Sequence, residues 1–453
     1  MKIRIYNARI LPMTEEKAGH FQIVEGEIQI IEDKIAYVGS SEIVPSGCGS
    51  TGKEQSASGA DDKWDREIDA QGNLILPGFK NAHTHSGMTF LRSYADDLPL
   101  LDWLNKQVFP MEAKLTPEDV YLFSKLAVLE YLTSGITANF DMYLTPDTMA
   151  QASKDLGFRT VICGAVNDFV QSVPEMEKWY KTYNQFDPLI SYQLGFHAEY
   201  TTSKPVLEDI AALAKDLKAP VYMHNSESCS ETEQCIDRTG MTPTAYLDSL
   251  GMFAHGGGGF HCIHMTEEDL EIFKERGLYV VTNPASNMKL ASGIPPLTKM
   301  LQMGIPVAIG TDGPASNNCL DMFREMFLVT GLAKLKEKDA AVVDAKEVLY
   351  MAAVQGARAI GLADCDSLAP GKQADLIMID LHQPNMQPLN NLTKNIVYSG
   401  SKQNVVMTMI AGKILYEKGE FYVPEDVERL YVDVNCRVEE LKSNNIRQKK
   451  RKP

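Results

Sequence analysis

The sequence predicts an α/β protein in which a (β/α)8 TIM barrel carries a small composite β-sandwich domain built from both chain ends. Three observations favour this class. Short strand-like segments separated by turn residues fill the chain up to about residue 73. From about residue 83 to residue 362, apolar strand candidates alternate with helical stretches, as in parallel βα units. After Gly361 short strand-like segments return, so the two ends of the chain can pair in one domain.

The composite domain is expected to join residues 1–73 to residues 366–425. Its expected strands are Lys2–Ala8, Gly26–Glu32, Lys34–Gly39, Leu376–Asp380, Asn404–Ile410 and Lys413–Tyr416. Gly47–Trp64 is rich in Gly, Ser, Ala and Asp, which predicts an exposed loop. Glu67–Leu74 then returns the chain to the main domain. Residues 426–453 are expected to form a C-terminal helix and a basic tail, and a short basic tail on an acidic protein indicates a solvated terminus.

The catalytic barrel is expected over residues 74–365. Its helices have clear signals: Thr116-Pro117-Glu118-Asp119 and Thr266-Glu267-Glu268-Asp269 each place an N-cap before acidic first-turn residues, and Gly135 and Gly277 end the helices that follow. With the strand that carries His83, the predicted strands number eight. The other seven are Ile136–Met142, Thr160–Val166, Leu189–Phe196, Pro220–His224, Phe260–His264, Tyr279–Asn283 and Val307–Thr311.

Composition excludes several classes of function. The net charge of −16 argues against nucleic acid as a partner. No apolar run approaches the roughly 20 residues that span a bilayer, and no signal peptide precedes the first strand. The eight cysteines include no Cys-x-x-Cys pair, which indicates reduced thiols. We therefore expect a cytoplasmic protein with a small-molecule substrate, no nucleic-acid or membrane partner, and assembly as a homo-oligomer.

The chain is organised around the stretch Leu76-Pro77-Gly78-Phe79-Lys80-Asn81-Ala82-His83-Thr84-His85. Histidines spaced i, i+2 lie on one face of a strand, so both imidazoles can reach one metal ion. A lone His-x-His pair is weak evidence. Three further polar groups follow apolar runs and strengthen it, namely His224-Asn225-Ser226-Glu227, His261-Cys262-Ile263-His264 and Gly310-Thr311-Asp312-Gly313. A barrel brings such strand ends together, which predicts a hydrolytic metal site.

Each of these residues also has a purely structural interpretation. Glu227 alone fits a surface glutamate, and Asp312 alone fits a helix N-cap, although a buried aspartate needs a partner and a metal is one. His261 and His264 are spaced i, i+3, so at most one of them points at the metal from an extended strand. We expect His264, at the predicted strand end, to face the metal and His261 to be a core or supporting histidine. The glycines 256–259 have no phosphate-loop pattern and are expected to form a loop.

Taken together, these motifs resemble the amidohydrolase superfamily, and within it the methylthioadenosine/S-adenosylhomocysteine deaminases and their triazine-hydrolase relatives. The resemblance covers nearly the whole chain. The matching stretches are Pro77–His85, His224–Glu227, His261-Cys262-Ile263-His264, Asn283-Pro284-Ala285-Ser286-Asn287-Met288-Lys289-Leu290 and Gly310-Thr311-Asp312-Gly313-Pro314-Ala315-Ser316-Asn317-Asn318.

The resemblance implies a role for each site residue. The implied metal ligands are His83, His85, His224 and Asp312, which would hold one divalent ion per chain, with zinc expected and iron as the alternative. The implied catalytic residues are Glu227 as proton carrier to the ring nitrogen, His264 beside the attacking water, and Asp312. Binuclear relatives use a lysine at the end of the fourth strand, where this chain has Leu194-Gly195-Phe196-His197-Ala198-Glu199, so a mononuclear site is implied.

Three further residues bear on the substrate. Glu112 matches the glutamate that grips the ribose hydroxyls in the resembling deaminases, and a carboxylate can accept both hydroxyl protons of a diol. A helix N-terminal glutamate is the alternative interpretation. His197 matches a nucleoside-contacting histidine. Trp103 is predicted to pack on an apolar 5′ group, with core packing as the equal alternative.

The expected reaction is hydrolytic deamination of a 5′-modified adenosine to the inosine analogue and ammonia. Relatives that accept S-adenosylhomocysteine carry arginines after the third strand, whereas Cys163–Gln171 has none. This departure favours 5′-methylthioadenosine, 5′-deoxyadenosine or adenosine over S-adenosylhomocysteine. The alternatives are an aminohydrolase or chlorohydrolase of another nitrogen heterocycle (guanine, pterin, triazine) and a non-catalytic ligand-binding relative.

Overall fold

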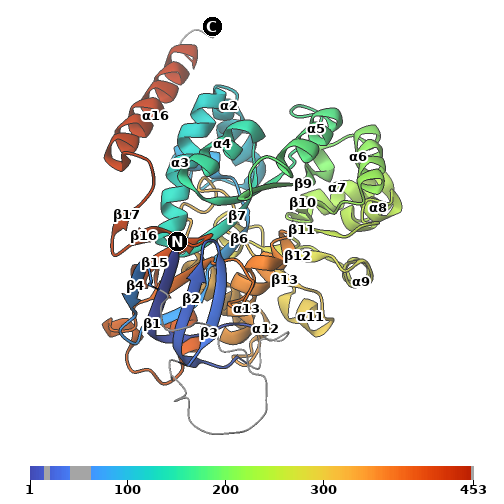
Figure 1. Cartoon of the computed structure of the whole chain (residues 1–453). Helices are drawn as coiled ribbons and strands as arrows, with labels where there is room; N and C mark the ends of the chain where they lie inside the picture. The colour runs from blue at the N-terminus through green and yellow to red at the C-terminus, as the bar shows by residue number, and fades with distance from the viewer. Residues whose placement is uncertain (15–20, 41–62, 450–453) are drawn as a thin grey trace.

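The structure is a computed structural model that describes residues 1–14, 21–40 and 63–449. Two hydrogen-bonded sheets organise it, one of eight strands from the middle of the chain and one of nine strands from both ends (Figure 1). The predicted (β/α)8 barrel with an additional sheet from the chain ends is confirmed. The predicted loop Gly47–Trp64 lies outside the described residues except for its last two, and so does the end of the basic tail. Over the described ranges, no helix has both the length and the apolar character needed to cross a membrane.

The barrel strands follow one another around the sheet in chain order, and neighbouring strands are parallel. The strands are β6 (Phe79–Thr84), β7 (Ile136–Met142), β8 (Arg159–Cys163), β9 (Ile190–Ala198), β10 (Val221–Asn225), β11 (Gly257–His261), β12 (Tyr279–Thr282) and β13 (Val307–Ile309). The main helices between and after them are α3 (Pro117–Thr133), α4 (Pro146–Leu156), α5 (Val173–Tyr183), α6 (Lys204–Leu217), α7 (Cys229–Thr239), α8 (Pro243–Ser249), α9 (Glu267–Arg276), α10 (Pro284–Lys289), α11 (Leu297–Gln302), α12 (Met322–Glu337) and α13 (Ala345–Tyr350).

Polar groups join the first and last barrel strands at their carboxyl ends. The backbone N–H of Asp312 donates to the carbonyl oxygen of His83 at 3.0 Å. The Asn81 side chain accepts from the N–H of Thr311 at 2.8 Å and donates to its hydroxyl at 2.7 Å. These bonds place the two sequence motifs that end in His85 and Asp312 side by side.

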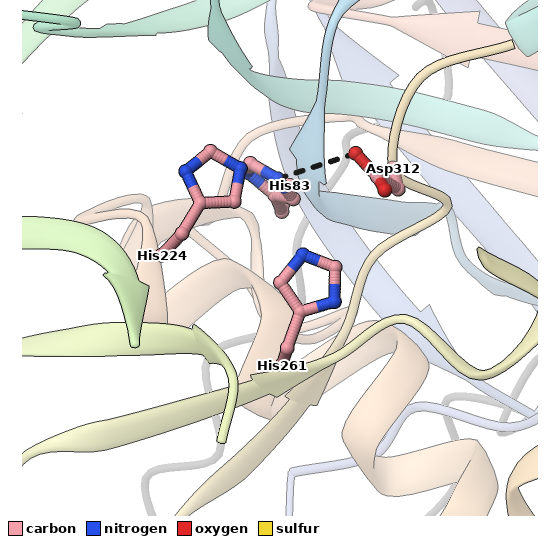
Figure 2. A group of neighbouring side chains, drawn as sticks. All are labelled: His83, His224, His261 and Asp312. Carbon is pink, nitrogen blue, oxygen red and sulfur yellow. Dashed lines mark ion pairs between the residues drawn. The ribbon is translucent and has the colours of Figure 1, made fainter. Parts of the chain in front are cut away.

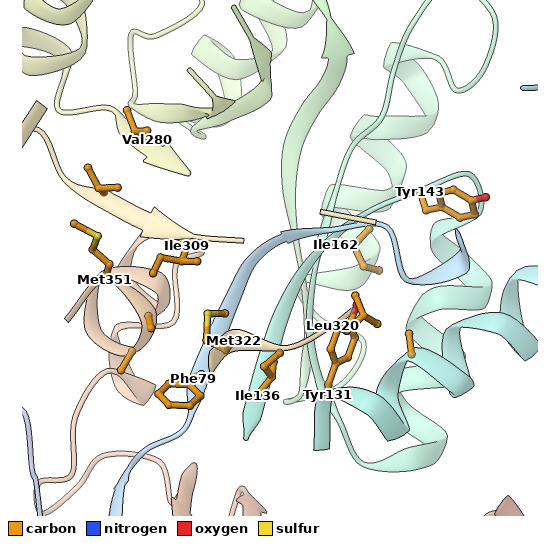
Figure 3. Packing of buried hydrophobic residues seen from close by; sticks show 14 of the residues in the cluster. Phe79, Tyr131, Ile136, Tyr143, Ile162, Val280, Ile309, Leu320, Met322 and Met351 are labelled. Atoms are coloured by element: carbon orange, nitrogen blue, oxygen red, sulfur yellow. The ribbon is translucent and has the colours of Figure 1, made fainter. Parts of the chain in front are cut away.

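Apolar packing fixes the strands on both sides of the barrel wall. Outside, Phe79, Tyr131 and Ile136 belong to one large buried cluster that joins β6 and β7 to the surrounding helices (Figure 3). Inside, Phe140, Tyr222 and Phe260 contact one another edge-on or stacked. Burying each such ring contributes about 1.5–3 kcal/mol. The inner aromatic rings form the floor on which the site residues lie.

The second sheet runs in the order β17-β16-β15-β14-β5-β1-β2-β3, with β4 paired to β1. It consists of β1 (Lys2–Ile10), β2 (Val24–Ile31), β3 (Lys34–Gly39), β4 (Arg66–Asp69), β5 (Leu74–Pro77), β14 (Leu376–Ile379), β15 (Val405–Ile410), β16 (Lys413–Glu417) and β17 (Glu420–Phe421). The hydrogen-bonded path is continuous, and β5 pairs with β1 and β14. Residues 74–77 therefore pair with this sheet, and the first barrel strand begins at Phe79.

Buried charges join the two sheets below the barrel. The guanidinium of Arg159, at the start of β8, donates to both carboxylate oxygens of Asp375 at 2.7 and 3.0 Å. The same carboxylate accepts from the N–H of Ala411 at 2.7 Å. Nearby, the ammonium of Lys80 is fully buried and donates to Gly78 and Thr137. The charged pair thus lies at the amino-terminal end of the barrel strands, opposite the site.

Helix boundaries follow the predicted caps. Thr116 and Thr266 form capping boxes with Asp119 and Asp269 at the starts of α3 and α9, and Gly277 ends α9 in the left-handed conformation. The C-terminal helix α16 (Val427–Lys449) lies beside α3 (Figure 1), held by the bond from Arg437 to Asp119.

The largest shift between expectation and structure lies in β11. The predicted strand was Phe260–His264, whereas the strand observed is Gly257–His261. The glycines there are needed for close packing: a Cβ on Gly257 would lie 1.9 Å from the carbonyl oxygen of Val221, and one on Gly258 would lie 2.4 Å from that of Tyr279. Glycine is depleted in strands, which is why the sequence predicted a loop at this position.

Candidate metal and active site

Four side chains from four barrel strands or their ends meet above the aromatic floor. The ligand atoms of His83, His224, His261 and Asp312 all lie within 4.8 Å of one another (Figure 2). All four side chains are buried. His85 joins them, because its Nε2 lies 3.2 Å from Oδ1 of Asp312, while Nε2 of His83 lies 3.5 Å from the same oxygen. The structure therefore brings together all four predicted metal ligands and adds His261.

Backbone and side-chain acceptors orient the imidazoles. Nδ1 of His85 donates to the carbonyl oxygen of Met142, and Nδ1 of His224 donates to that of His197 at 2.7 Å. Nδ1 of His261 donates to the Asn287 side chain at 2.7 Å. A hydrogen bond at Nδ1 fixes the tautomer and leaves Nε2 as a ligand atom. Three of the rings thus present Nε2 to the centre.

The centre contains buried polar atoms that have no hydrogen-bond partner among the described residues, although two of them lie within 4 Å of a carboxylate oxygen. They are both ring nitrogens of His83 and Nε2 of His261. Orphaned buried polar groups of this kind are costly and call for an explanation. Burial lowers the pKa of His83 to about 3, and burial together with the neighbouring histidines lowers the pKa of His224 well below its usual range. Neutral imidazoles and one carboxylate are the donor set of a borderline divalent metal, so the residues fit such an ion.

Asp312 is held in position by the motifs on either side. It adopts a left-handed backbone conformation with φ of 58°. Its Oδ2 accepts hydrogen bonds from the hydroxyls of Ser286 at 2.6 Å and Ser316 at 2.8 Å, which leaves Oδ1 for the histidines. Burial works to raise the pKa of Asp312, but the neighbouring imidazoles of His83 and His85 hold it well below its usual range. The two serines lie inside the motifs singled out from the sequence, although no role was predicted for them.

Glu227 lies next to His261. Its Oε2 is 3.7 Å from Nε2 of His261, and its Oε1 accepts from the Ser292 hydroxyl at 3.4 Å. The side chain is buried, and burial raises its pKa. Glu227 is not one of the four clustered ligand residues. Its carboxylate lies beside the cluster, next to His261.

In the motif His261-Cys262-Ile263-His264, the sequence predicted that His264 faces the metal, but the structure places His261 in the cluster. His261 ends β11 and faces the cluster, whereas Nε2 of His264 donates to the carbonyl oxygen of Ser292 at 2.9 Å. The reason is the shift of β11 described above. The strand-end histidine does point inward, but the strand ends three residues earlier than the sequence indicated.

The predicted substrate residues separate into two groups. The ring of His197 lies 5.0 Å from that of His224, next to the cluster. Glu112, at the end of α2 (Phe109–Glu112), has a buried Oε1 with no partner among the described residues. Burial raises the pKa of Glu112, while Tyr143 and His85 act to lower it. Trp103 is 6% exposed and packs in the core with Leu104 and Val108, which is its alternative interpretation.

The arginines near the barrel are engaged elsewhere. Arg159 binds Asp375 below the barrel, and Arg92 donates to Glu130 and to the carbonyl oxygen of Asn318. Gln171 is the last residue of the segment without arginine. Its side chain accepts a hydrogen bond from the N–H of Ala165 and donates to the carbonyl oxygens of Tyr143 and Leu144.

A parallel barrel with histidine and aspartate ligands at the carboxyl ends of its strands defines a metal-dependent hydrolase. The Amidohydrolase family model matches residues 74–415, and the chain belongs to this family. Its curated relatives include the 5-methylthioadenosine/S-adenosylhomocysteine deaminase of Caldanaerobacter subterraneus subsp. tengcongensis, 38% identical over 450 residues, which are 97% of this chain and 99% of that protein.

Solved structures of similar proteins include two with zinc. An adenosine deaminase from Xanthomonas campestris with bound zinc superimposes with a TM-score of 0.88 at 31% identity, over 97% of this chain and 98% of that one. Atrazine chlorohydrolase from Arthrobacter aurescens, complexed with zinc, gives a TM-score of 0.85 at 20% identity, over 96% of this chain and 100% of that one. At 20% identity, the similarity to atrazine chlorohydrolase shows a shared fold and nothing more. The cluster and the zinc-bound adenosine deaminase support a divalent metal in this chain.

Proposed function

We propose that this protein is a zinc-dependent deaminase of adenosine nucleosides that carry a small apolar group, or a hydroxyl, at the 5′ position. The reaction breaks the C6–N bond of the purine, forms a C6–O bond with water, and releases ammonia. The observation that carries the proposal is the combination of the histidine and aspartate cluster with two carboxylates, that of Glu227 beside His261 and that of Glu112, whose buried Oε1 has no hydrogen-bond partner among the described residues. The relatives named as deaminases support the same assignment.

The proposed metal ligands are His83, His85, His224 and Asp312, with His261 alongside. A divalent metal held there would lower the pKa of water to about 7 and so would make a nucleophile available at neutral pH. Glu227 takes one proton from the attacking water and delivers it to the ring nitrogen N1, and the second proton of that water goes to the leaving amine. His261, held by Asn287, takes the place predicted for His264 beside the attacking group. General acid–base steps of this kind contribute about 10²–10⁴-fold each.

The purified protein is expected to contain about one zinc or iron ion per chain. Three histidines and an aspartate suit these ions better than Mg²⁺, and the strand end at His197 offers no lysine that could bridge a second metal. Elemental analysis of the protein, before and after dialysis against a chelator, measures this number. Two ions per chain would contradict the mononuclear assignment.

Glu112→Ala is expected to impair ribosides selectively. The proposed contact to both ribose hydroxyls is charge-assisted, so its loss should cost roughly 2–4 kcal/mol in kcat/KM. The comparison is kcat/KM for a riboside and for its 2′,3′-dideoxy analogue in both proteins. Glu118→Ala, which changes an exposed glutamate six residues further on, is the control. An unchanged ratio of riboside to dideoxyriboside in Glu112→Ala would exclude the ribose role.

The 5′ side is expected to favour uncharged groups. Cys163–Gln171 offers no cation, and Arg92 and Arg159 are engaged in the bonds described above. Because an unpaired carboxylate is costly in a mostly buried site, 5′-methylthioadenosine, 5′-deoxyadenosine or adenosine should exceed S-adenosylhomocysteine in kcat/KM by one to two orders of magnitude, about 1.4–2.7 kcal/mol. Side-by-side kinetics on the four nucleosides test this, and S-adenosylhomocysteine as the best substrate would show that another cation serves the site.

A further inference from the structure

The turn that carries Glu227 has an unusual backbone. β10 ends at Asn225, and Ser226 then adopts a left-handed conformation with φ of 51°. A residue with a side chain adopts this conformation at a cost in free energy, and it persists only where the surroundings hold it. Ser226 is fully buried. Since Glu227 is the next residue, the conformation of Ser226 sets the direction in which the Glu227 side chain leaves the backbone.

One buried carboxylate holds this turn. Oε1 of Glu231 accepts from the N–H of Ser226 at 3.1 Å, and Oε2 accepts from the N–H of Glu227 at 2.8 Å. Oε2 also lies 3.5 Å from the N–H of Ser228, which is the N-cap residue of α7. An ordinary capping box uses only the N-cap N–H. Here the two shorter bonds go to residues outside the helix, so the carboxylate of Glu231 serves the turn more than the helix.

The opposite side of the turn is fixed by the loop after β11. The carbonyl oxygen of Ser226 accepts from the backbone N–H groups of Ile263 at 3.1 Å and His264 at 2.9 Å. The turn is thus held between Glu231 and the segment that follows His261. This arrangement sets Glu227 opposite His261, at the 3.7 Å separation described above.

We propose that Glu231 is a positioning residue for Glu227: its carboxylate holds the left-handed turn at Ser226 and so aims the Glu227 carboxylate at the site. The inference rests on the proposed role of Glu227 as proton carrier. Glu231 is itself only 4% exposed, and its carboxylate faces backbone N–H groups. It therefore acts through Glu227.

The test is a double-mutant cycle between Glu231→Ala and Glu227→Gln, measured by kcat and KM for ammonia release from 5′-methylthioadenosine. In the wild-type background, Glu231→Ala should lower kcat by about 10–10²-fold, the loss expected for a misplaced catalytic group, with KM and metal content little changed. In the Glu227→Gln background the same change should lower kcat less than about threefold, because groups that act as a unit are strongly non-additive. An equal loss in both backgrounds would overturn the proposal.

Two further variants separate positioning from stability. Glu175→Ala removes an exposed capping-box glutamate from α5, whose oxygen accepts from Ser172 at 2.9 Å. Glu175→Ala should lower the melting temperature without lowering kcat.

Glu231→Gln keeps the capping geometry but offers one acceptor oxygen instead of two, so its kcat should lie between those of the wild type and Glu231→Ala. If Glu231→Ala does not fold, Glu231→Gln replaces it in the double-mutant cycle with Glu227→Gln. A wild-type kcat in Glu231→Gln would contradict the proposal. Full activity of Glu227→Gln alone would instead refute the proton-carrier role on which the inference rests.

Discussion

Replacing Glu227 with glutamine is expected to lower kcat about 10³-fold, which corresponds to about 4 kcal/mol of transition-state stabilisation. Glutamine has the same shape and can form hydrogen bonds, but it cannot take up and return a proton. Because Glu227 lies outside the group of four clustered ligand residues, the variant should keep its metal and its fold. Steady-state ammonia release, elemental analysis and a thermal melt measure the three quantities.

The matched control is Glu233→Gln, which changes an exposed glutamate on α7, the helix that begins two residues after Glu227. It carries the same chemical change at a distance from the cluster and should keep wild-type kcat. Near-normal turnover of Glu227→Gln would remove this residue from the proposed mechanism, whatever the control shows.

The second large effect is expected on stability, at the opposite end of the barrel. Asp375→Ala should lower the free energy of unfolding by about 3–5 kcal/mol, because it leaves the guanidinium of Arg159 buried without its partner. The Asp375 side chain is fully buried and that of Arg159 is 6% exposed. Activity per folded molecule should not change, since the pair lies below the barrel floor. Urea unfolding followed by circular dichroism measures the difference.

A control pair and a pH dependence sharpen this prediction. Arg276 and Asp248 form a similar ion pair at the surface, so Asp248→Ala should lower the free energy of unfolding by less than about 1 kcal/mol.

Burial works to raise the pKa of Asp375, but Arg159 holds it below its usual range. The stabilisation is therefore present above the unfolded-state pKa of about 3.9 and is lost as pH falls below it. Equal losses in the two alanine variants would contradict a special role for the buried pair.

Most of the architecture could be predicted because its signals are local. Alternating apolar strands and capped helices give the barrel, and the observed β3 and β7 have the predicted bounds. The approach of His83, His85, His224 and Asp312 to one another could be predicted because each lies at or just after the end of an apolar strand, and a parallel barrel gathers all strand ends at one face.

The misplaced prediction at β11 has a tertiary cause. Gly257 and Gly258 form a strand because the backbones of β10 and β12 approach too closely for any side chain, and this packing cannot be seen in the local sequence. The same limit applies to Ser226 and Glu231, whose hydrogen bonds depend on a left-handed turn. Trp103 shows the converse, because an aromatic side chain near a predicted site is equally suited to the core in which it is found.

The most direct test of the account is ammonia release by the purified, metal-loaded protein from 5′-methylthioadenosine, compared with release from free adenine, guanine and an amino-triazine. A nucleoside deaminase with Glu112 at the ribose should turn over 5′-methylthioadenosine with a kcat/KM of about 10⁴ M⁻¹s⁻¹ or more, within the usual range for enzymes, and should act on the free rings far more slowly. Equal or faster turnover of guanine or the triazine, with no action on the nucleoside, would contradict the proposed function.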